Sequence, residues 1–365
     1  RLEREEVGRL SSRFSPTARR AVFTYSYSNF RHDPEKVLLK YFDFFFYLSN
    51  WGTKRIMFKL PKAITNYQAL KAYVSDFESA YMDNGIRIFK RAESVLIDFN
   101  LTQEESEWWV DEDQTQLSTE LRGLRKNILE GDYRCLFIMW LHIKSLEYQY
   151  KQLDEDFEIP LRLIPANLAI SNSNLDALME FFGVDRDWVN GAARYSPDLQ
   201  EQADTYTDKL AQLSWEKKDE FLLKILRGEQ NLKFKLKKEL AKLQSREQRP
   251  NERSGSISIG QLFSSVQKET DKRKAQEQRE VELAYVRRMK ETEKQKEVIL
   301  REIDYHVQKG SGKSYDEALE RIINLRELAI YKSEQEQFKV WLSIFKTTVS
   351  NKPAMLRRLA ENDIR

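Results

Sequence analysis

A single long stretch of charged residues limits what this chain can fold into. Residues 261–308 run for close to fifty positions without proline or glycine. As one helix the stretch would form a rod of roughly 70 Å. Its apolar residues gather toward the two ends, and between 267 and 280 only Ala275 is apolar. Because apolar heptad positions are not sustained, we expect a helix solvated on most faces and not a continuous coiled coil.

The first part of the chain has the mixed periodicity of an α/β region. Alternating apolar residues predict strands at 21–27 and 54–61. Residues 85–101 are expected to form two strands joined around Arg91 to Glu93. A further helix is predicted over 65–81, opened by a capping box from Thr65 to Gln68.

The most apolar stretch of the chain, YFDFFFYLSNW, covers residues 41–51. It follows a helix start at Asp33 and Pro34, so we expect the helix to continue through it. The stretch has about half the length that a membrane span requires. We therefore predict a core helix there and no membrane partner.

From residue 115 onward the pattern is almost wholly helical, interrupted by RPNERSGSISIG at 249–260, which has the composition of a flexible connection. The predicted fold class is α+β and predominantly helical, with a long charged helix and a C-terminal helical hairpin. The expected divisions are an α+β domain at 1–114, a helical domain at 115–248, the linker at 249–260, and the long helix with its terminal hairpin at 261–365.

The charge distribution bears on the partner of this protein, and its cysteine usage favours a reducing compartment. The net charge is +3, but residues 1–215 carry 27 basic and 33 acidic side chains, and residues 216–365 carry 34 and 25. The surplus of positive charge in the second part hints at a polyanionic partner. The single cysteine, Cys135, lies in the apolar run CLFIMWL and cannot form a disulfide within the chain. We expect a cytoplasmic protein.

The sequence GSGKS at 310–314 spells the end of a phosphate-binding loop. The first glycine of that motif would fall at Val307, and charged helix precedes it where a buried strand is needed. We therefore interpret the stretch as a turn between helices. Gly310 would end the long helix, and Ser314 with Glu317 would form the capping box of the next.

Evidence for catalytic chemistry is sparse. The three histidines, His32, His142 and His306, have no metal-ligand spacing, so neither a metal nor another cofactor is expected. One acidic cluster could serve a metal-dependent hydrolase, but an exposed acidic loop with its tryptophans packed inward explains it better. Its members flank two tryptophans and are Glu107, Asp111, Glu112 and Asp113.

A basic helix over residues 231–246 is the best candidate for contact with nucleic acid. Its leucines make one apolar stripe, and lysines surround the other faces, where they could meet phosphates without base specificity. Alternatively, this is a helix of a bundle whose lysines simply face solvent, because such a helix would show the same spacing. The lysines are Lys233, Lys235, Lys237, Lys238 and Lys242.

Several segments together resemble a family of bacterial proteins without an assigned activity. They begin at RLSSRFSPTARRAVFTYSYSNF and include LRKNILEGDYRCLFIMWL, YDEALERIINLRELA and KPAMLRRLAENDI, so the resemblance covers nearly the whole chain. Family members usually start with a short strand ahead of Arg1, which implies that this chain lacks its first segment. They also commonly carry a basic residue and proline where this chain has Gly310 to Lys313. The resemblance supports the architecture and supplies no catalytic residue.

The function expected from these observations is a non-enzymatic, cytosolic interaction protein. Its long helix and C-terminal helices would hold a partner protein. The alternatives are a nucleic-acid accessory factor that uses the basic helix, and a metal-dependent hydrolase that uses the acidic cluster.

Overall fold

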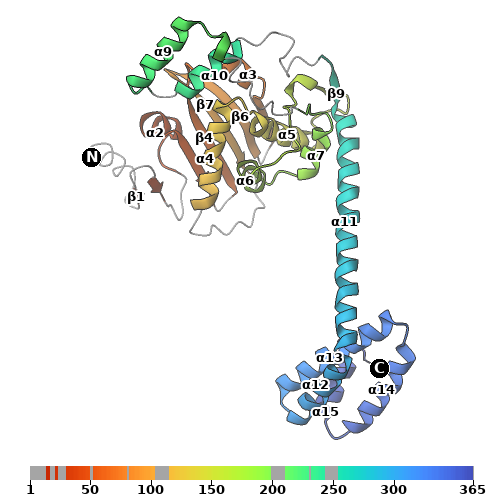
Figure 1. The fold of residues 1–365 in the computed structure, drawn as a ribbon. Helices are drawn as coiled ribbons and strands as arrows, with labels where there is room; N and C mark the ends of the chain where they lie inside the picture. The colour runs from red at the N-terminus through yellow and green to blue at the C-terminus, as the bar shows by residue number, and fades with distance from the viewer. Residues whose placement is uncertain are drawn as a thin grey trace. The chain divides into compact units, whose positions relative to one another are not determined.

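The computed structural model describes residues 14–16, 21–23, 30–49, 52–79, 82–102, 115–198, 210–229, 232–242 and 254–364. It is a predominantly helical α+β protein, which confirms the predicted fold class (Figure 1). The chain divides into two compact units, residues 1–270 and 271–365. All described strands belong to the first unit.

One antiparallel sheet of five strands organises the first unit, in the order β3-β4-β7-β6-β5. A tight turn at Ala92 and Glu93 joins β6 to β7, as the sequence predicted. Two short strand pairs, β1 with β2 and β8 with β9, lie outside this sheet. The strands are β1 (Phe14–Pro16), β2 (Ala21–Phe23), β3 (Phe44–Leu48), β4 (Thr53–Pro61), β5 (Ser75–Ser79), β6 (Met82–Arg91), β7 (Ser94–Thr102), β8 (Glu158–Pro160) and β9 (Ser256–Ser258).

Helices occur in both units. Those of the first unit are α2 (Pro34–Tyr41), α3 (Tyr67–Lys71), α4 (Thr115–Leu129), α5 (Arg134–Gln149), the 3₁₀ turn η1 (Leu161–Leu163), α6 (Ser173–Phe182), α7 (Arg186–Ala193), α9 (Trp215–Leu226) and α10 (Leu232–Lys242). The helix α11 (Ile259–Lys294) contributes residues to both units. The second unit continues with α12 (Lys296–Lys309), α13 (Gly312–Tyr331), α14 (Gln335–Thr348) and α15 (Pro353–Glu361).

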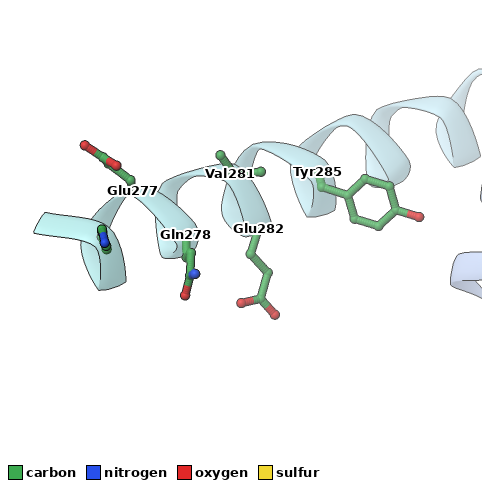
Figure 2. A pocket seen from close by; sticks show the side chains of 6 residues that line it. Glu277, Gln278, Val281, Glu282 and Tyr285 are labelled. Atoms are coloured by element: carbon green, nitrogen blue, oxygen red, sulfur yellow. The ribbon is translucent and has the colours of Figure 1, made fainter. Parts of the chain in front are cut away.

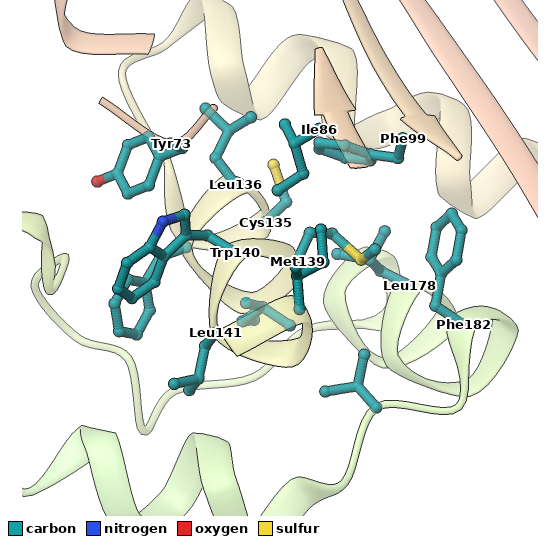
Figure 3. Packing of buried hydrophobic residues seen from close by; sticks show 14 of the residues in the cluster. Tyr73, Ile86, Phe99, Cys135, Leu136, Met139, Trp140, Leu141, Leu178 and Phe182 are labelled. Carbon is teal, nitrogen blue, oxygen red and sulfur yellow. The ribbon is translucent and has the colours of Figure 1, made fainter. Parts of the chain in front are cut away.

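The main core lies between one face of the sheet and α5. Alternate residues of β4 and β7, such as Phe58 and Phe99, are fully buried on this face. They share one cluster with α5, whose Cys135 and Met139 are also buried, and with α6 (Figure 3). Because α5 is covered on several sides, it is apolar around much of its circumference, which explains the run CLFIMWL.

The opposite face of the sheet combines a small apolar cluster with an ionic one. Leu38 of α2 packs on Met57 and Leu96. Beside them Asp98 is fully buried and accepts two hydrogen bonds of 2.8 Å from Arg55 and further ones from Arg87. A buried carboxylate is tolerated here because two guanidinium groups on the neighbouring strands satisfy it.

Two predicted helices of the first part are too long, although α2 confirms the helix start at Asp33 and Pro34. The stretch FFFYL forms the strand β3, which pairs with β4 from Phe44↔Phe58 to Leu48↔Lys54, so the core helix expected over 41–51 does not exist. The helix predicted over 65–81 shrinks to α3, after which β5 pairs with β6. In both cases pairing with a long neighbouring strand outweighs local helical preference. Asn66, and not Thr65, caps α3.

The long charged run also differs from the expected rod. A turn at Gln295 separates α11 from α12, so the run forms two helices. The 36 residues of α11 correspond to a length of about 54 Å. Residues beyond the break turn their apolar side chains, Ile299, Ile303 and Val307, into the core of the second unit.

The segment expected as a linker contributes structure at its end. Ser256–Ser258 form β9, which pairs with β8, and Ile257 and Ile259 are buried. The sheet and the middle helices share one core, so the structure divides the chain near residue 270 and not near 114. Among the described residues, no helix is both long and apolar enough to cross a membrane.

Candidate functional site

The acidic cluster predicted as a possible metal site lies outside the described residues. Glu107, Asp111, Glu112 and Asp113 all fall within residues 103–114. Elsewhere, in the parts of the chain that the structure describes, no three His, Cys, Asp or Glu side chains gather closely enough to hold a metal ion.

The basic helix is α10, and its described lysines are already engaged. Lys233 lies 2.9 Å and Lys237 3.8 Å from a carboxylate oxygen of Glu130, and Lys235 lies 3.0 Å from Glu229. Burial alone would raise the pKa of Glu130, but the hydrogen bond from Lys233 and the nearby lysine charges lower it. Lys238 and Lys242 belong to α10, and their side chains are outside the described part. Lys233 and Lys237 thus link α10 to the end of α4, whereas Lys235 pairs with a residue just before its own helix.

The turn at 310–314 has the geometry of a helix connection. Gly310 adopts a left-handed conformation with φ of 70° and ends α12, as predicted. Ser311 caps α13, because its Oγ accepts from the backbone N–H of Ser314 at 3.2 Å. The predicted capping box is therefore wrong: Ser314 lies inside the first turn of α13. Glu317 faces α12, where its carboxylate lies 2.8 Å from Nδ1 of His306. A helix precedes the turn, so it lacks the strand of a phosphate-binding loop.

His142 is a buried titratable group of the first unit whose pKa is strongly lowered. It lies on α5, buried in the core, and among the described residues its Nε2 has no hydrogen-bond partner. Burial lowers its pKa to about 4, and the positive charge of Lys54 on β4 adds to the effect. Burial likewise lowers the pKa of Lys54. Burial raises the pKa of the Cys135 thiol, so this cysteine is a core residue without thiolate character.

The best candidate for an interaction surface is a line of residues on α11 in the second unit. Lys274, Gln278, Val281 and Tyr285 recur at intervals of four, three and four residues, and we call them the α11 stripe. Val281 is 70% exposed. Glu277 and Glu282 lie beside them on the same exposed helix (Figure 2). All six residues come from one helix, so the surface is an open helix face that leaves room for a partner along it.

The α11 stripe continues directly into a packed interface. The ring of Tyr285 meets Tyr331 of α13 edge to face, with 6.0 Å between centroids. One turn further on, Arg288 forms an ion pair with Glu327 of α13, and Met289 is buried. The helix face that packs on α13 in its last turns is therefore exposed in the turns before them.

Side-chain pairs within α11 stabilise this helix where no other helix of the described residues covers it. Arg273 lies 3.1 Å from Glu277, and Gln276 donates to Glu280 at 2.9 Å. Such pairs four residues apart stabilise an exposed helix by a few tenths of a kcal/mol each. A second exposed apolar pair, Val340 and Ile344, lies on α14 and is about as exposed as Val281.

The charged run did single out the helix, but sequence reasoning missed the stripe itself. Its signal was the pair Val281 and Tyr285, four residues apart, but Leu283, Ala284 and Val286 stand in the same turns and conceal the one-sided pattern. Comparisons with known proteins add no constraint: no family model, no curated protein and no solved structure matches the chain.

Proposed function

We propose that this protein is a non-enzymatic interaction protein whose second unit holds a helical segment of a partner protein. The observation that carries the proposal is the exposed α11 stripe, which extends a face already built to pack against a helix. A partner helix lying along the α11 stripe would bury Val281 and continue the contacts that α13 makes with Tyr285 and Arg288.

The composition of the stripe supports a reversible complex more than a permanent one. Val281 is the only fully aliphatic member, and Lys274, Glu277 and Glu282 surround it with charge of both signs. Obligate interfaces are more apolar than this. The expected partner helix therefore carries an apolar residue opposite Val281 and charged residues beside it.

Site-specific cross-linking in living cells tests the proposal. A photo-reactive phenylalanine analogue replaces Val281 in one variant and Leu283 in the other. Leu283 is also exposed, but two residues turn it to about the opposite side of the helix. We expect a cross-linked partner band from position 281 and not from 283. Equal cross-linking, or none at either position, would contradict the proposal.

The hydrolase and nucleic-acid alternatives stay untested proposals, and no contact in the described residues favours them. Three lysines of the basic helix are paired with carboxylates, so few would be free for phosphates. Retarded migration of duplex or single strands at low salt, lost steeply as salt rises, would nevertheless support a nucleic-acid role. Heat on titration with Mg²⁺, Mn²⁺ or Zn²⁺ would support the hydrolase.

A further inference from the structure

The charged side chains of α11 are sorted around the helix where the α11 stripe is exposed. Numbered in heptads with Val281 at position d, the stripe fills consecutive a and d positions, which form the seam of a helix pair. The e and g positions border such a seam and help to select the partner. They are occupied here by Ala275, Glu277, Glu282 and Ala284. Both charged members are glutamates, so the exposed seam has acidic borders.

The two glutamates lie on opposite borders of the seam. Glu277 and Glu282 are about 140° apart around the helix, and Figure 2 shows their side chains leaving it in different directions. Glu277 pairs with Arg273 at 3.1 Å, but an exposed pair of this kind is weak and exchanges readily. Glu282 is exposed and forms no ion pair with any described residue. Cations on a partner helix could therefore reach both carboxylates.

The basic side chains of the same segment do not cancel these borders. Lys274 lies within the seam, one turn from Glu277, but it is eight residues from Glu282, or about 12 Å along the axis. Salt screens exposed charges over about 8 Å under physiological conditions. The other basic residues take positions b and c, on the side away from the seam, and are Lys272, Arg273 and Arg279. The acidic character of the seam is therefore strongest at Glu282.

A second copy of the chain fits this seam poorly. In a parallel pair of helices, a g residue meets the e residue five positions later on the other helix, so Glu277 would face Glu282 of the copy on both borders. In an antiparallel pair, g meets g and e meets e, so within this segment each glutamate would meet alanine or glutamate. Neither orientation supplies a cation for the carboxylates. The seam is therefore suited to a different helix.

From this arrangement we infer that the partner of the α11 stripe is a basic amphipathic helix, with lysine or arginine on both borders of the apolar residue that meets Val281. The inference rests on the proposed function and adds the chemistry that selects the partner. One basic residue would meet Glu282, and another would share Glu277 with Arg273. Opposite charges across a helix pair speed association and exclude wrong partners more than they add affinity. This suits a reversible complex.

Photo-cross-linking of the whole protein from position 281, in cells of the native host, tests the charge of the partner. The cross-linked peptide, sequenced by mass spectrometry, should carry lysine or arginine within four residues of the cross-linked position. Adding Glu282→Lys to the same chain places a positive charge against that basic border. The yield of the cross-link should then fall at least about fivefold.

Glu280→Lys is the matched control, because Glu280 is an exposed glutamate at position c, on the side away from the seam. Its cross-link yield should stay within about twofold. An undiminished yield with Glu282→Lys, an equal loss with Glu280→Lys, or a cross-linked peptide without basic residues overturns the inference and leaves the proposed function standing. A peptide from a second copy of this chain also overturns the inference. The absence of any cross-link from position 281 contradicts the inference and the proposed function together.

Discussion

At the scale of single residues, His142 shows how burial converts an ordinary side chain into a source of pH dependence. The unfolded chain binds a proton at this residue near pH 6.5, whereas the folded chain binds it only near pH 4. Protonation therefore favours unfolding between these two values. Sequence reasoning found only that His142 lacks metal-ligand spacing, and it could not find Lys54, which approaches from a strand far away in the chain.

The first prediction follows from this difference in pKa. As pH falls from 6.5 to 4, His142 should remove about 3 kcal/mol from the free energy of unfolding. Above pH 6.5 its contribution is constant. Urea unfolding of the natural chain and of His142→Gln at several pH values measures this, and the natural chain should lose stability relative to the variant as pH falls. A difference that stays constant from pH 7 to pH 4 would contradict the assignment.

The second prediction concerns the turn that spells part of a phosphate loop. Ser311→Ala removes the cap of α13 and should lower the free energy of unfolding by about 1 kcal/mol. Lys313→Ala, at an exposed neighbouring position, should leave stability within about 0.5 kcal/mol. Calorimetric titration of the natural chain with ATP should give no binding heat; ATP affinity that Lys313→Ala abolishes would show that the turn does bind phosphate.

At the scale of elements, the sequence predicted most helices and the β6–β7 hairpin, and it failed where strand pairing decides. The run FFFYL has no polar alternation, because both faces of β3 are partly covered, so its periodicity resembles that of a buried helix. Likewise, no proline or glycine near Gln295 marks the break between α11 and α12 in the sequence. The turn is instead placed by the packing of α12 against α13, which a local pattern does not record.

The third prediction concerns the close packing between the first turns of α11 and α7. Its first turns pack on α7, where a Cβ added to Gly191 would lie 2.9 Å from Cγ2 and 3.0 Å from the backbone N of Val266. Gly191→Ala should therefore force the two helices apart and cost about 1–3 kcal/mol. Asn190→Ala, on the exposed side of α7, is the control and should have little effect in the same denaturation experiment. Equal stability of the two variants would show that the close approach is not required.

At the scale of the whole molecule, two separate cores underlie the division of the chain. The second unit has its own cluster, from Ile299 on α12 to Ile364 at the end of the described chain. Because the sequence shows composition but not contacts, it indicated a boundary at the polar segment 249–260, and the contacts instead divide the chain within α11.

The fourth prediction is that residues 271–365 fold when produced alone. Their buried cluster draws on α12, α13, α14 and α15, which is enough for a cooperative unit. Urea unfolding followed by far-ultraviolet circular dichroism should show one sigmoidal transition. A gradual, non-cooperative loss of signal would mean that the second unit depends on the first.

The central claim is that the α11 stripe holds a partner protein, and quantitative affinity purification from the native host tests it most directly. Whole protein, Val281→Glu and Leu283→Glu are compared, because both variants place the same charge at an exposed apolar position of one helix. We predict that a specific partner is lost at least about tenfold from Val281→Glu and retained by Leu283→Glu. A partner retained equally by both variants, or lost equally from both, would contradict the claim.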